Sequence, residues 1–179
     1  MRPKMIGKNK VHPVGIGTMP WANSKMWGYG ALMGVKEAGP AYDAAVAAGV
    51  DLFDTAEIYG FGKSEKIVGE ILAARGSAGI KIATKYAPLP WRRSIKSFKK
   101  ALEKSLTRLG LDSITLYQTH FSGGGVSVEE LMSGMADALD EGKIEAAGVS
   151  NYSAEEMRRA HEVLVSRGHR LASNQVEFS

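Results

Sequence analysis

At 179 residues with 44% hydrophobic and 23% charged side chains, the chain has the composition of one soluble globular domain, with ample apolar residues for a core. The absence of cysteine excludes disulfides, thiolate nucleophiles and sulfur-based zinc sites. The net charge of +4 is too small and too scattered for a nucleic-acid surface, although it mildly favours an anionic ligand such as a phosphorylated cofactor.

Six short runs of β-branched and apolar residues alternate with helical patterns at intervals of roughly thirty residues, the length of a strand-plus-helix unit. No Pro-rich or low-complexity linker interrupts the series, so residues 1–179 are interpreted as a single domain. The predicted strands cover residues 14–19, 51–55, 81–85, 113–120, 145–150 and 173–178.

Helical patterns fill the stretches between these strands. The clearest covers residues 95–109, with apolar side chains at three- and four-residue steps and lysines mostly on the other side. Capping-box spacings that start at Ser127 and Ser153 predict helices that begin there. Two further helices are predicted over residues 40–48 and 64–75, each stopped by a following glycine.

The repeated strand–helix order implies parallel strands with helices packed outside, in either a closed barrel or an open doubly wound sheet. The open dinucleotide-binding fold would show G-x-G-x-x-G after its first strand, but that turn reads GIGTMPWANS. GFGKSE does not match a phosphate loop either, because the first glycine of that motif would fall at Glu57. We therefore predict an α/β fold of the TIM (β/α)8 barrel type, present as about six parallel strands, with its active site at the C-terminal strand ends.

Four polar side chains stand where apolar runs end: Asp54, Tyr59, Lys85 and His120. Reduction of a carbonyl by hydride transfer places negative charge on the oxygen, which requires a proton or a strong hydrogen bond there. Tyrosine can donate, but its ordinary pKa near 10 makes it a slow acid, and an adjacent lysine is expected to lower that pKa. An aspartate would hold the lysine charged, and a histidine would orient the carbonyl oxygen or relay a proton.

Motifs along the chain resemble those of the aldo-keto reductase family. Its successive strand and loop motifs are similar, in order and spacing, to DLFDTAEIYGFGKSEKIVGEIL, KIATKY, LYQTH and GVSNYSAEEM, and its first strand resembles GIGTM. The resemblance aligns the four polar residues above with the family's catalytic tetrad, with Tyr59 as general acid. It implies an NADP-dependent oxidoreductase that reduces small aldehydes or ketones to alcohols and binds NADP(H) without a Rossmann fold.

The resemblance also implies which residues contact the cofactor. One group matches the strand end that lies against the cofactor, and another matches positions that hydrogen-bond the nicotinamide carboxamide. The expected cofactor-binding residues are Gly17, Thr18, Met19, Asp54, Ser150, Asn151 and Gln175.

Aromatic residues follow several strand ends, where they could line a substrate pocket. The expected pocket residues are Trp21, Trp27, Tyr86 and Trp91. No histidine shows metal-ligand spacing with carboxylates, so no metal is predicted.

Each site residue also has a purely structural interpretation. Asp54 and Lys85 could form only an ion pair in the barrel mouth, Tyr59 could be a packed aromatic, and His120 could be a satisfied core histidine. Ser150 could simply lead into the next helix. Independent structural reasons would have to coincide at all four tetrad positions, which favours the functional interpretation.

The main departure from the family is length, because an eight-stranded barrel needs about 250 residues. In the family the last two strand–loop units hold the cofactor's pyrophosphate and 2′-phosphate, and these units are not in this sequence. Six open strands would expose two unpaired edges. The alternatives are a piece of a longer reductase, a homo-oligomer or partner chain that completes the barrel, and a non-catalytic regulatory or binding subunit similar to potassium-channel β-subunits.

The expected partner is a small carbonyl substrate, with no nucleic acid and no membrane. No apolar stretch reaches the roughly 18 residues of a membrane helix, and the first ten residues lack the apolar core of a secretory signal. The lack of cysteine fits a reducing compartment. A cytoplasmic location is therefore expected, with the plastid stroma or another reducing compartment, after removal of a transit peptide, as the alternative.

Overall fold

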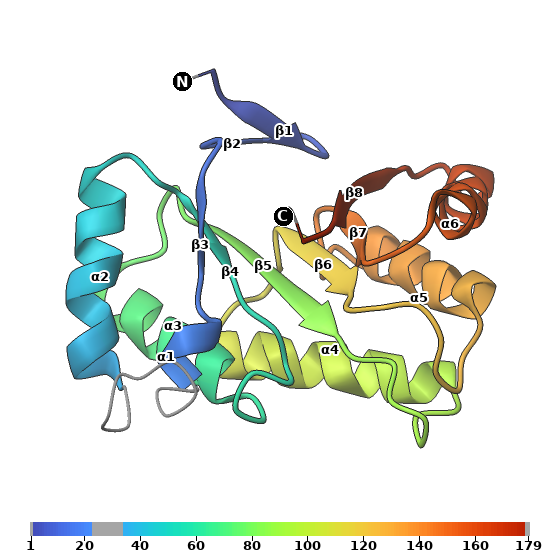
Figure 1. The fold of residues 1–179 in the computed structure, drawn as a ribbon, viewed down its shortest axis with the longest axis horizontal. Helices are drawn as coiled ribbons and strands as arrows, with labels where there is room; N and C mark the ends of the chain where they lie inside the picture. Colours follow the sequence, from blue (N-terminus) through green and yellow to red (C-terminus); the bar gives the residue numbers. More distant parts are fainter. Residues whose placement is uncertain (1, 23–33, 178–179) are drawn as a thin grey trace.

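The computed structural model describes residues 2–22 and 34–177. Six parallel strands form one sheet in sequence order, β3-β4-β5-β6-β7-β8, and a separate hairpin pairs β1 with β2. The sheet curls into half a barrel with helices on its outer side (Figure 1). The strands are β1 Lys4–Ile6, β2 Asn9–Val11, β3 Gly15–Gly17, β4 Leu52–Asp54, β5 Lys81–Tyr86, β6 Leu116–Thr119, β7 Ala147–Ser150 and β8 Leu171–Gln175. The helices are α1 Met19–Ala22, α2 Val35–Ala47, α3 Lys63–Arg75, α4 Ile95–Leu109, α5 Val128–Asp140 and α6 Ala154–Ser166.

The predicted parallel sheet is confirmed, and each predicted strand overlaps one of β3 to β8. The last strand is displaced, since β8 begins at Leu171 and ends at Gln175, earlier than the predicted range of 173–178. Leu171 packs against the main core, and the exposed residues after Gln175 do not. The hairpin of β1 and β2 was not predicted, because its three-residue strands are too short and too rich in lysine to show a clear alternation.

Helix α2 starts earlier than predicted, at Val35 and not at residue 40. Its N-cap is Gly34, whose backbone N–H donates to the side chain of Glu37 at 2.9 Å. Pro40 therefore lies inside the helix, although the sequence pattern placed it at the start. Pro40 lacks only its own N–H, which would have bonded to the carbonyl of Lys36, so the turn that precedes it can still form.

The two capping boxes are confirmed. The backbone N–H of Glu130 donates to the Ser127 hydroxyl, and the Ser127 N–H donates back to the Glu130 carboxylate, both at 3.2 Å. Ser153 and Glu156 make the same exchange at the start of α6. These contacts satisfy backbone donors that a helix start leaves free, which fixes where α5 and α6 begin.

Side chains of the curled sheet alternate between two apolar clusters, as expected for successive residues of a strand. One set, including Phe53, Ile82 and Tyr117, packs under the helices in the main core. The alternate positions form a smaller cluster with Ile6 of the hairpin; its members are Ile6, Leu52, Ala83, Leu116, Ala146 and Ala172. The hairpin thus covers the N-terminal end of the half-barrel interior and leaves the C-terminal strand ends free for polar residues.

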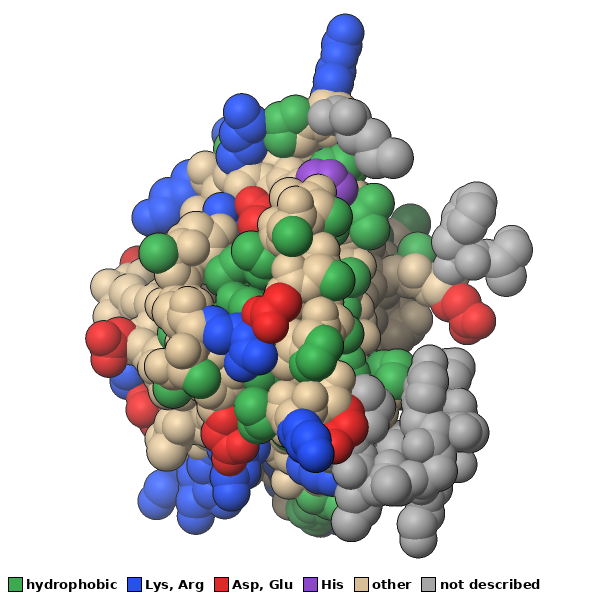
Figure 2. All heavy atoms as spheres, turned by 90° about the vertical axis from the view of Figure 1, so that its left-hand side faces the viewer, with side chains coloured by type: hydrophobic (Ala, Val, Ile, Leu, Met, Phe, Trp, Pro, Cys, Tyr) green, Lys and Arg blue, Asp and Glu red, His purple; other side chains and the backbone are tan. Residues whose placement is uncertain are grey.

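The helical surface carries charges of both signs. Figure 2 shows Lys, Arg, Asp and Glu side chains interspersed with apolar ones on the side of the molecule where α2 lies. An ion pair between Arg75 of α3 and Asp43 of α2, at 2.6 Å, joins these two helices. In the described ranges, no helix combines the length and hydropathy that crossing a bilayer requires, and no group of three metal-ligating side chains is found.

Candidate active site

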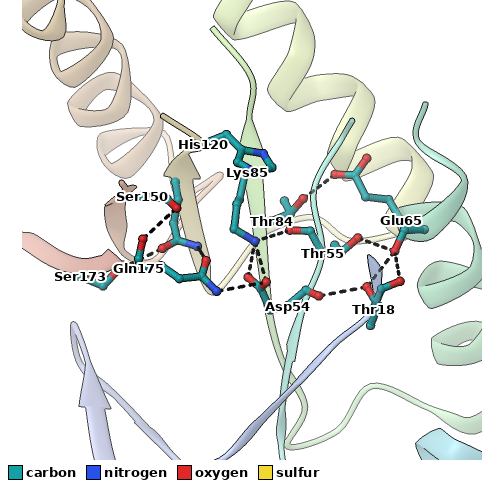
Figure 3. A network of polar contacts seen from close by, with 12 residues as sticks. Thr18, Asp54, Thr55, Glu65, Thr84, Lys85, His120, Ser150, Ser173 and Gln175 are labelled. Atoms are coloured by element: carbon teal, nitrogen blue, oxygen red, sulfur yellow. Dashed lines mark hydrogen bonds and ion pairs between the residues drawn. The ribbon is translucent and has the colours of Figure 1, made fainter. Parts of the chain in front are cut away.

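The C-terminal ends of neighbouring strands bring the expected catalytic residues to one rim of the half-barrel. Asp54 is the last residue of β4, Lys85 lies near the end of β5, and His120 directly follows β6. Tyr59 comes from the turn after β4, where its N–H donates to the carbonyl of Ala56 at 3.0 Å. Three consecutive parallel strands therefore place the four side chains side by side, and Figure 3 shows Asp54, Lys85 and His120 along this rim.

Buried Lys85 forms an ion pair with Asp54, whose side chain is partly exposed. The ammonium of Lys85 donates to Oδ1 and Oδ2 of Asp54 at 2.7 and 2.6 Å and to the carbonyl of Thr55 at 3.0 Å. The side chain of Lys85 is 2% exposed, and burial lowers its pKa while Asp54 opposes that shift. An ammonium has three donors, so these contacts use all of them.

Tyr59 lies between Lys85 and His120. The ammonium of Lys85 is 5.4 Å from the centre of the Tyr59 ring, and the His120 ring meets the Tyr59 ring edge-on with centroids 5.6 Å apart. In the described part of the chain, no hydrogen bond joins the ammonium of Lys85 to the Tyr59 hydroxyl. The rim thus places the Tyr59 ring close to both the ammonium of Lys85 and the imidazole of His120.

The ionisation of Tyr59 differs from the sequence-based expectation that Lys85 lowers its pKa. Burial raises the pKa of Tyr59 to about 12, and the negative charge of Asp54 contributes in the same direction. The expectation fails chiefly because burial penalises the charged phenolate, and the ammonium of Lys85 is directed at Asp54 and not at the Tyr59 hydroxyl. The phenol is therefore protonated at neutral pH.

His120 is neutral at neutral pH. Burial lowers its pKa to about 4, and the positive charge of Lys85 adds to this shift. Its Nδ1 atom is buried and has no hydrogen-bond partner among the described residues. A neutral imidazole can donate a hydrogen bond from one nitrogen and accept one at the other.

The expected carboxamide-binding residues meet at the ends of β7 and β8. The hydroxyl of Ser150 donates to the carbonyl of Gln175 at 2.9 Å, and Asn151 donates through its side chain to the Ser150 hydroxyl at 3.1 Å. The side-chain amide of Gln175 in turn donates to Asp54 Oδ2 at 3.3 Å, a contact drawn in Figure 3. These groups therefore adjoin the expected catalytic residues.

The residues present fit a nicotinamide ring at this rim. A Cβ atom added to Gly17, at the end of β3, would meet no atom of the described residues within 4 Å, so these residues leave the surface beside Asp54 open there. The hydroxyl and amide groups of Ser150, Asn151 and Gln175 can pair with the donor and the acceptor of a carboxamide. An open face next to such a donor set is what a flat ring with an amide substituent requires.

The other residues expected beside the cofactor lie in the wall of the site. Thr18 is fully buried, and its hydroxyl donates to the Asp54 carbonyl at 3.0 Å and contacts the Ser64 hydroxyl at 2.8 Å. Its side chain therefore supports the β3–β4 junction and does not face the open surface. Met19 is partly buried at the start of α1.

Two of the expected pocket residues belong to the core, which corrects the sequence-based assignment. Trp21 is 5% exposed and lies against Phe53, with ring centroids 6.4 Å apart. Tyr86 is fully buried, with its ring edge-on to Phe98 of α4 at 5.3 Å. Tyr86 adjoins Lys85 on the strand, so alternation turns it toward the helices when Lys85 faces the interior.

The remaining pocket predictions have different outcomes. Trp91 is 73% exposed in the loop after β5, on the rim side of the molecule. Its role in a pocket stays a prediction. Trp27 lies outside the described residues.

Sequence reasoning missed two buried carboxylates near the site. Glu65 of α3 accepts from the Thr84 hydroxyl at 2.7 Å and from Arg108 at 2.6 Å. Glu57, in the turn before Tyr59, pairs with Arg92. An acidic residue between Ala56 and Ile58, so close to a strand end, is the signal that could have identified Glu57 as a buried group.

Comparison with known proteins identifies relatives of this arrangement. The sequence profile of the Aldo/keto reductase family matches residues 13–179. The chain is 35% identical to the chloroplastic pyridoxal reductase of Arabidopsis thaliana and 43% identical to an uncharacterized oxidoreductase of Mycobacterium bovis, in each case over 97% of this chain. A crystal structure of an aldo-keto reductase from Klebsiella pneumoniae in complex with NADPH superposes with a TM-score of 0.81, at 28% identity, over 99% of this chain and 58% of that one.

The chain spans about half the length of these two curated relatives, 51% in each case. The profile match nevertheless covers the whole curled sheet, from before β3 to after β8, and the solved relative supports the TIM-barrel origin of the fold. The chain belongs to the aldo-keto reductase family.

Proposed function

We propose that the protein containing this chain is an NADPH-dependent oxidoreductase that reduces aldehydes or ketones to alcohols, with Tyr59 as the proton donor. The observation that supports this most is the contact of Tyr59 with both Lys85 and His120 at the rim, beside the open end of β3. When bound, NADPH supplies a hydride to the carbonyl carbon, and the residues of this chain act on the oxygen.

The residues at the ends of β7 and β8 are proposed to hold the nicotinamide carboxamide. Ser150, Asn151 and Gln175 supply hydroxyl and amide groups within hydrogen-bond distance of one another. Gly17, at the end of β3, has no side chain, which leaves room for the nicotinamide ring on the side of the site away from β7 and β8. The choice of NADPH follows the solved relative, which was crystallised in complex with that cofactor.

Tyr59 is proposed to give its proton to the carbonyl oxygen as negative charge develops there. Its raised pKa, about 12, keeps the hydroxyl protonated and ready to donate throughout the neutral range. The ammonium of Lys85 is 5.4 Å from the centre of the Tyr59 ring, and its positive charge would stabilise the phenolate once the proton has moved. His120, being neutral, would orient the carbonyl oxygen with a hydrogen bond and not with a charge.

The proposal is tested by incubating the protein with NADPH and a panel of aldehydes and ketones, with pyridoxal included, and measuring both NADPH oxidation and the alcohol product. We expect one alcohol formed per NADPH oxidised. Lys85→Met should lower kcat by about 10²-fold or more, because the phenolate would lose its neighbouring cation. The matched control Lys96→Met, on the exposed side of α4, should leave kcat unchanged. A folded protein that forms no alcohol from any member of the panel would contradict the proposal.

A further inference from the structure

Glu57 is a buried acid two residues before Tyr59, and neither the tetrad nor the cofactor site uses it. It is 8% exposed. Its Oε1 accepts the backbone N–H of Ala87 at 2.7 Å and a short contact from Arg92, and its Oε2 accepts from Arg92 at 3.1 Å. A carboxylate held by a two-pronged guanidinium contact and a backbone donor is fixed in position and orientation.

The contacts of Glu57 continue the β4–β5 ladder beyond the end of β4. The N–H of Thr55 donates to the Ala83 carbonyl at 2.8 Å, and the N–H of Glu57 donates to the Lys85 carbonyl at 3.2 Å. The next donor, just after the end of β5, is the N–H of Ala87, and it is the Glu57 side chain that accepts it. The carboxylate thus replaces a backbone carbonyl at the point where the chain turns away toward Tyr59.

His120 is also hydrogen-bonded to this part of the chain, at the end of β5. The N–H of His120 donates to the Tyr86 carbonyl at 2.8 Å. Arg92 returns to the segment as well, because it donates to the Ala87 carbonyl at 3.1 Å and lies over the Tyr86 ring at 5.1 Å. Residues 85–87 therefore include Lys85 and bond to two other parts of the site. The carbonyl of Tyr86 accepts from His120, and the N–H of Ala87 donates to Glu57 in the turn that contains Tyr59.

We infer that Glu57, held by Arg92, is a positioning residue that sets the placement of Tyr59 relative to Lys85 and His120. The inference rests on the proposed function, because it assigns a role in the same proton-donating site. Removal of the charge of Glu57 weakens its side-chain contacts with Arg92 and the Ala87 N–H, which loosens the turn although the backbone bond from Glu57 to Lys85 remains. Displacement of a reacting group by about 1 Å can lower a rate by about 10²-fold even when the chemistry is untouched.

The test compares Glu57→Gln with the intact protein by two independent readouts. The first is the kinetics of aldehyde reduction, in which kcat should fall at least about tenfold while KM for NADPH stays within about twofold, together with a change in the pH dependence of kcat. The second is NMR without cofactor, in which the Tyr59 and His120 ring resonances should shift and their mutual nuclear Overhauser contact should weaken. Arg92→Lys, which keeps the charge but loses the two-pronged contact, should give a smaller change of the same kind.

A matched control is available on α6, where Glu162 pairs with Arg158 at 3.1 Å and both side chains are exposed. Glu162→Gln should change neither readout. If Glu57→Gln does not fold, as judged by circular dichroism, Arg92→Lys carries the same test. A folded variant with unchanged kcat and unchanged ring resonances overturns the inference.

Failure of the proposed function has a different signature. If the intact protein reduces no carbonyl compound, the proposed function fails and the NMR comparison alone decides the role of Glu57. Displaced Tyr59 and His120 resonances in Glu57→Gln would then still support positioning by Glu57, and undisplaced ones would refute it.

Discussion

One carboxylate, that of Asp54, contacts both halves of the candidate site. Its Oδ2 accepts from Lys85 of β5 at 2.6 Å and from Gln175 of β8 at 3.3 Å. Asp54 thereby links Lys85, which lies beside the proposed proton donor, to the group proposed to hold the carboxamide. Because both partners donate to the same oxygen atom, we expect that loss of either contact alters the position of that oxygen relative to the other partner.

The placement of single residues could be predicted only in part from the sequence. Asp54, Lys85 and His120 were identifiable because each follows an apolar run, and the ends of parallel strands share one edge. The raised pKa of Tyr59 was not predictable, since it depends mainly on how deeply the folded chain buries the phenol, and also on the nearby charge of Asp54. The partner of Glu57 was not predictable either, because Arg92 lies 35 residues away and no periodicity connects them.

A pH-dependent contribution to stability is expected from His120. Its pKa is lowered to about 4 in the folded chain, whereas an unfolded histidine has a pKa near 6.5. The unfolded state therefore binds the proton more readily, so the free energy of unfolding should fall as the pH falls from about 6.5 toward 4. Urea unfolding at neutral and mildly acid pH should show a smaller fall for His120→Gln than for the intact protein. An equal fall in both would contradict this assignment.

At the scale of secondary-structure elements, the sequence predicted the features that neighbouring side chains mark and missed those that give no such signal or depend on contacts between elements. The helices that carry capping boxes, α5 and α6, were predictable because the signal lies within four residues. The start of α2 was not, since a glycine N-cap gives no side-chain signal and Pro40 suggested a later start. The close approach of α3 to α4 could not be predicted from the sequence either, because it depends on Gly69 having no side chain at the point of contact.

Gly69→Ala should weaken the contact between α3 and α4. A Cβ atom at this position would lie 2.3 Å from the Arg108 carbonyl oxygen, a backbone atom that cannot move independently. We expect a loss of about 1–3 kcal/mol in the free energy of unfolding, despite the better helix propensity of alanine. Gly39→Ala is the matched control, because its Cβ would meet only the end of the flexible Arg75 side chain. Urea unfolding in which Gly69→Ala is no less stable than Gly39→Ala would contradict the close contact.

At the scale of the whole molecule, the sheet is half a barrel with an edge strand on each side. β3 pairs only with β4, and β8 pairs only with β7, among the strands of the described residues. Gly17 and Gln175, which flank the proposed nicotinamide site, lie on these two edge strands. We propose that further strands, from the same protein or from a partner chain, pair with both edges in the active protein and complete the cofactor site. The sequence predicted the six parallel strands of the half-barrel in outline, because the strand order follows from the repeated strand–helix pattern.

The central claim is that the hydroxyl of Tyr59 donates the proton in carbonyl reduction at this rim. Its most direct test is the single-turnover rate of NADPH oxidation, with saturating carbonyl substrate, for Tyr59→Phe and for Tyr42→Phe, a buried tyrosine stacked on Phe53 away from the rim. Tyr59→Phe should be slower by about 10²- to 10⁴-fold, the contribution typical of general acid catalysis, with binding of NADPH unchanged and Tyr42→Phe close to the intact protein. A Tyr59→Phe rate equal to that of the intact protein would contradict the claim.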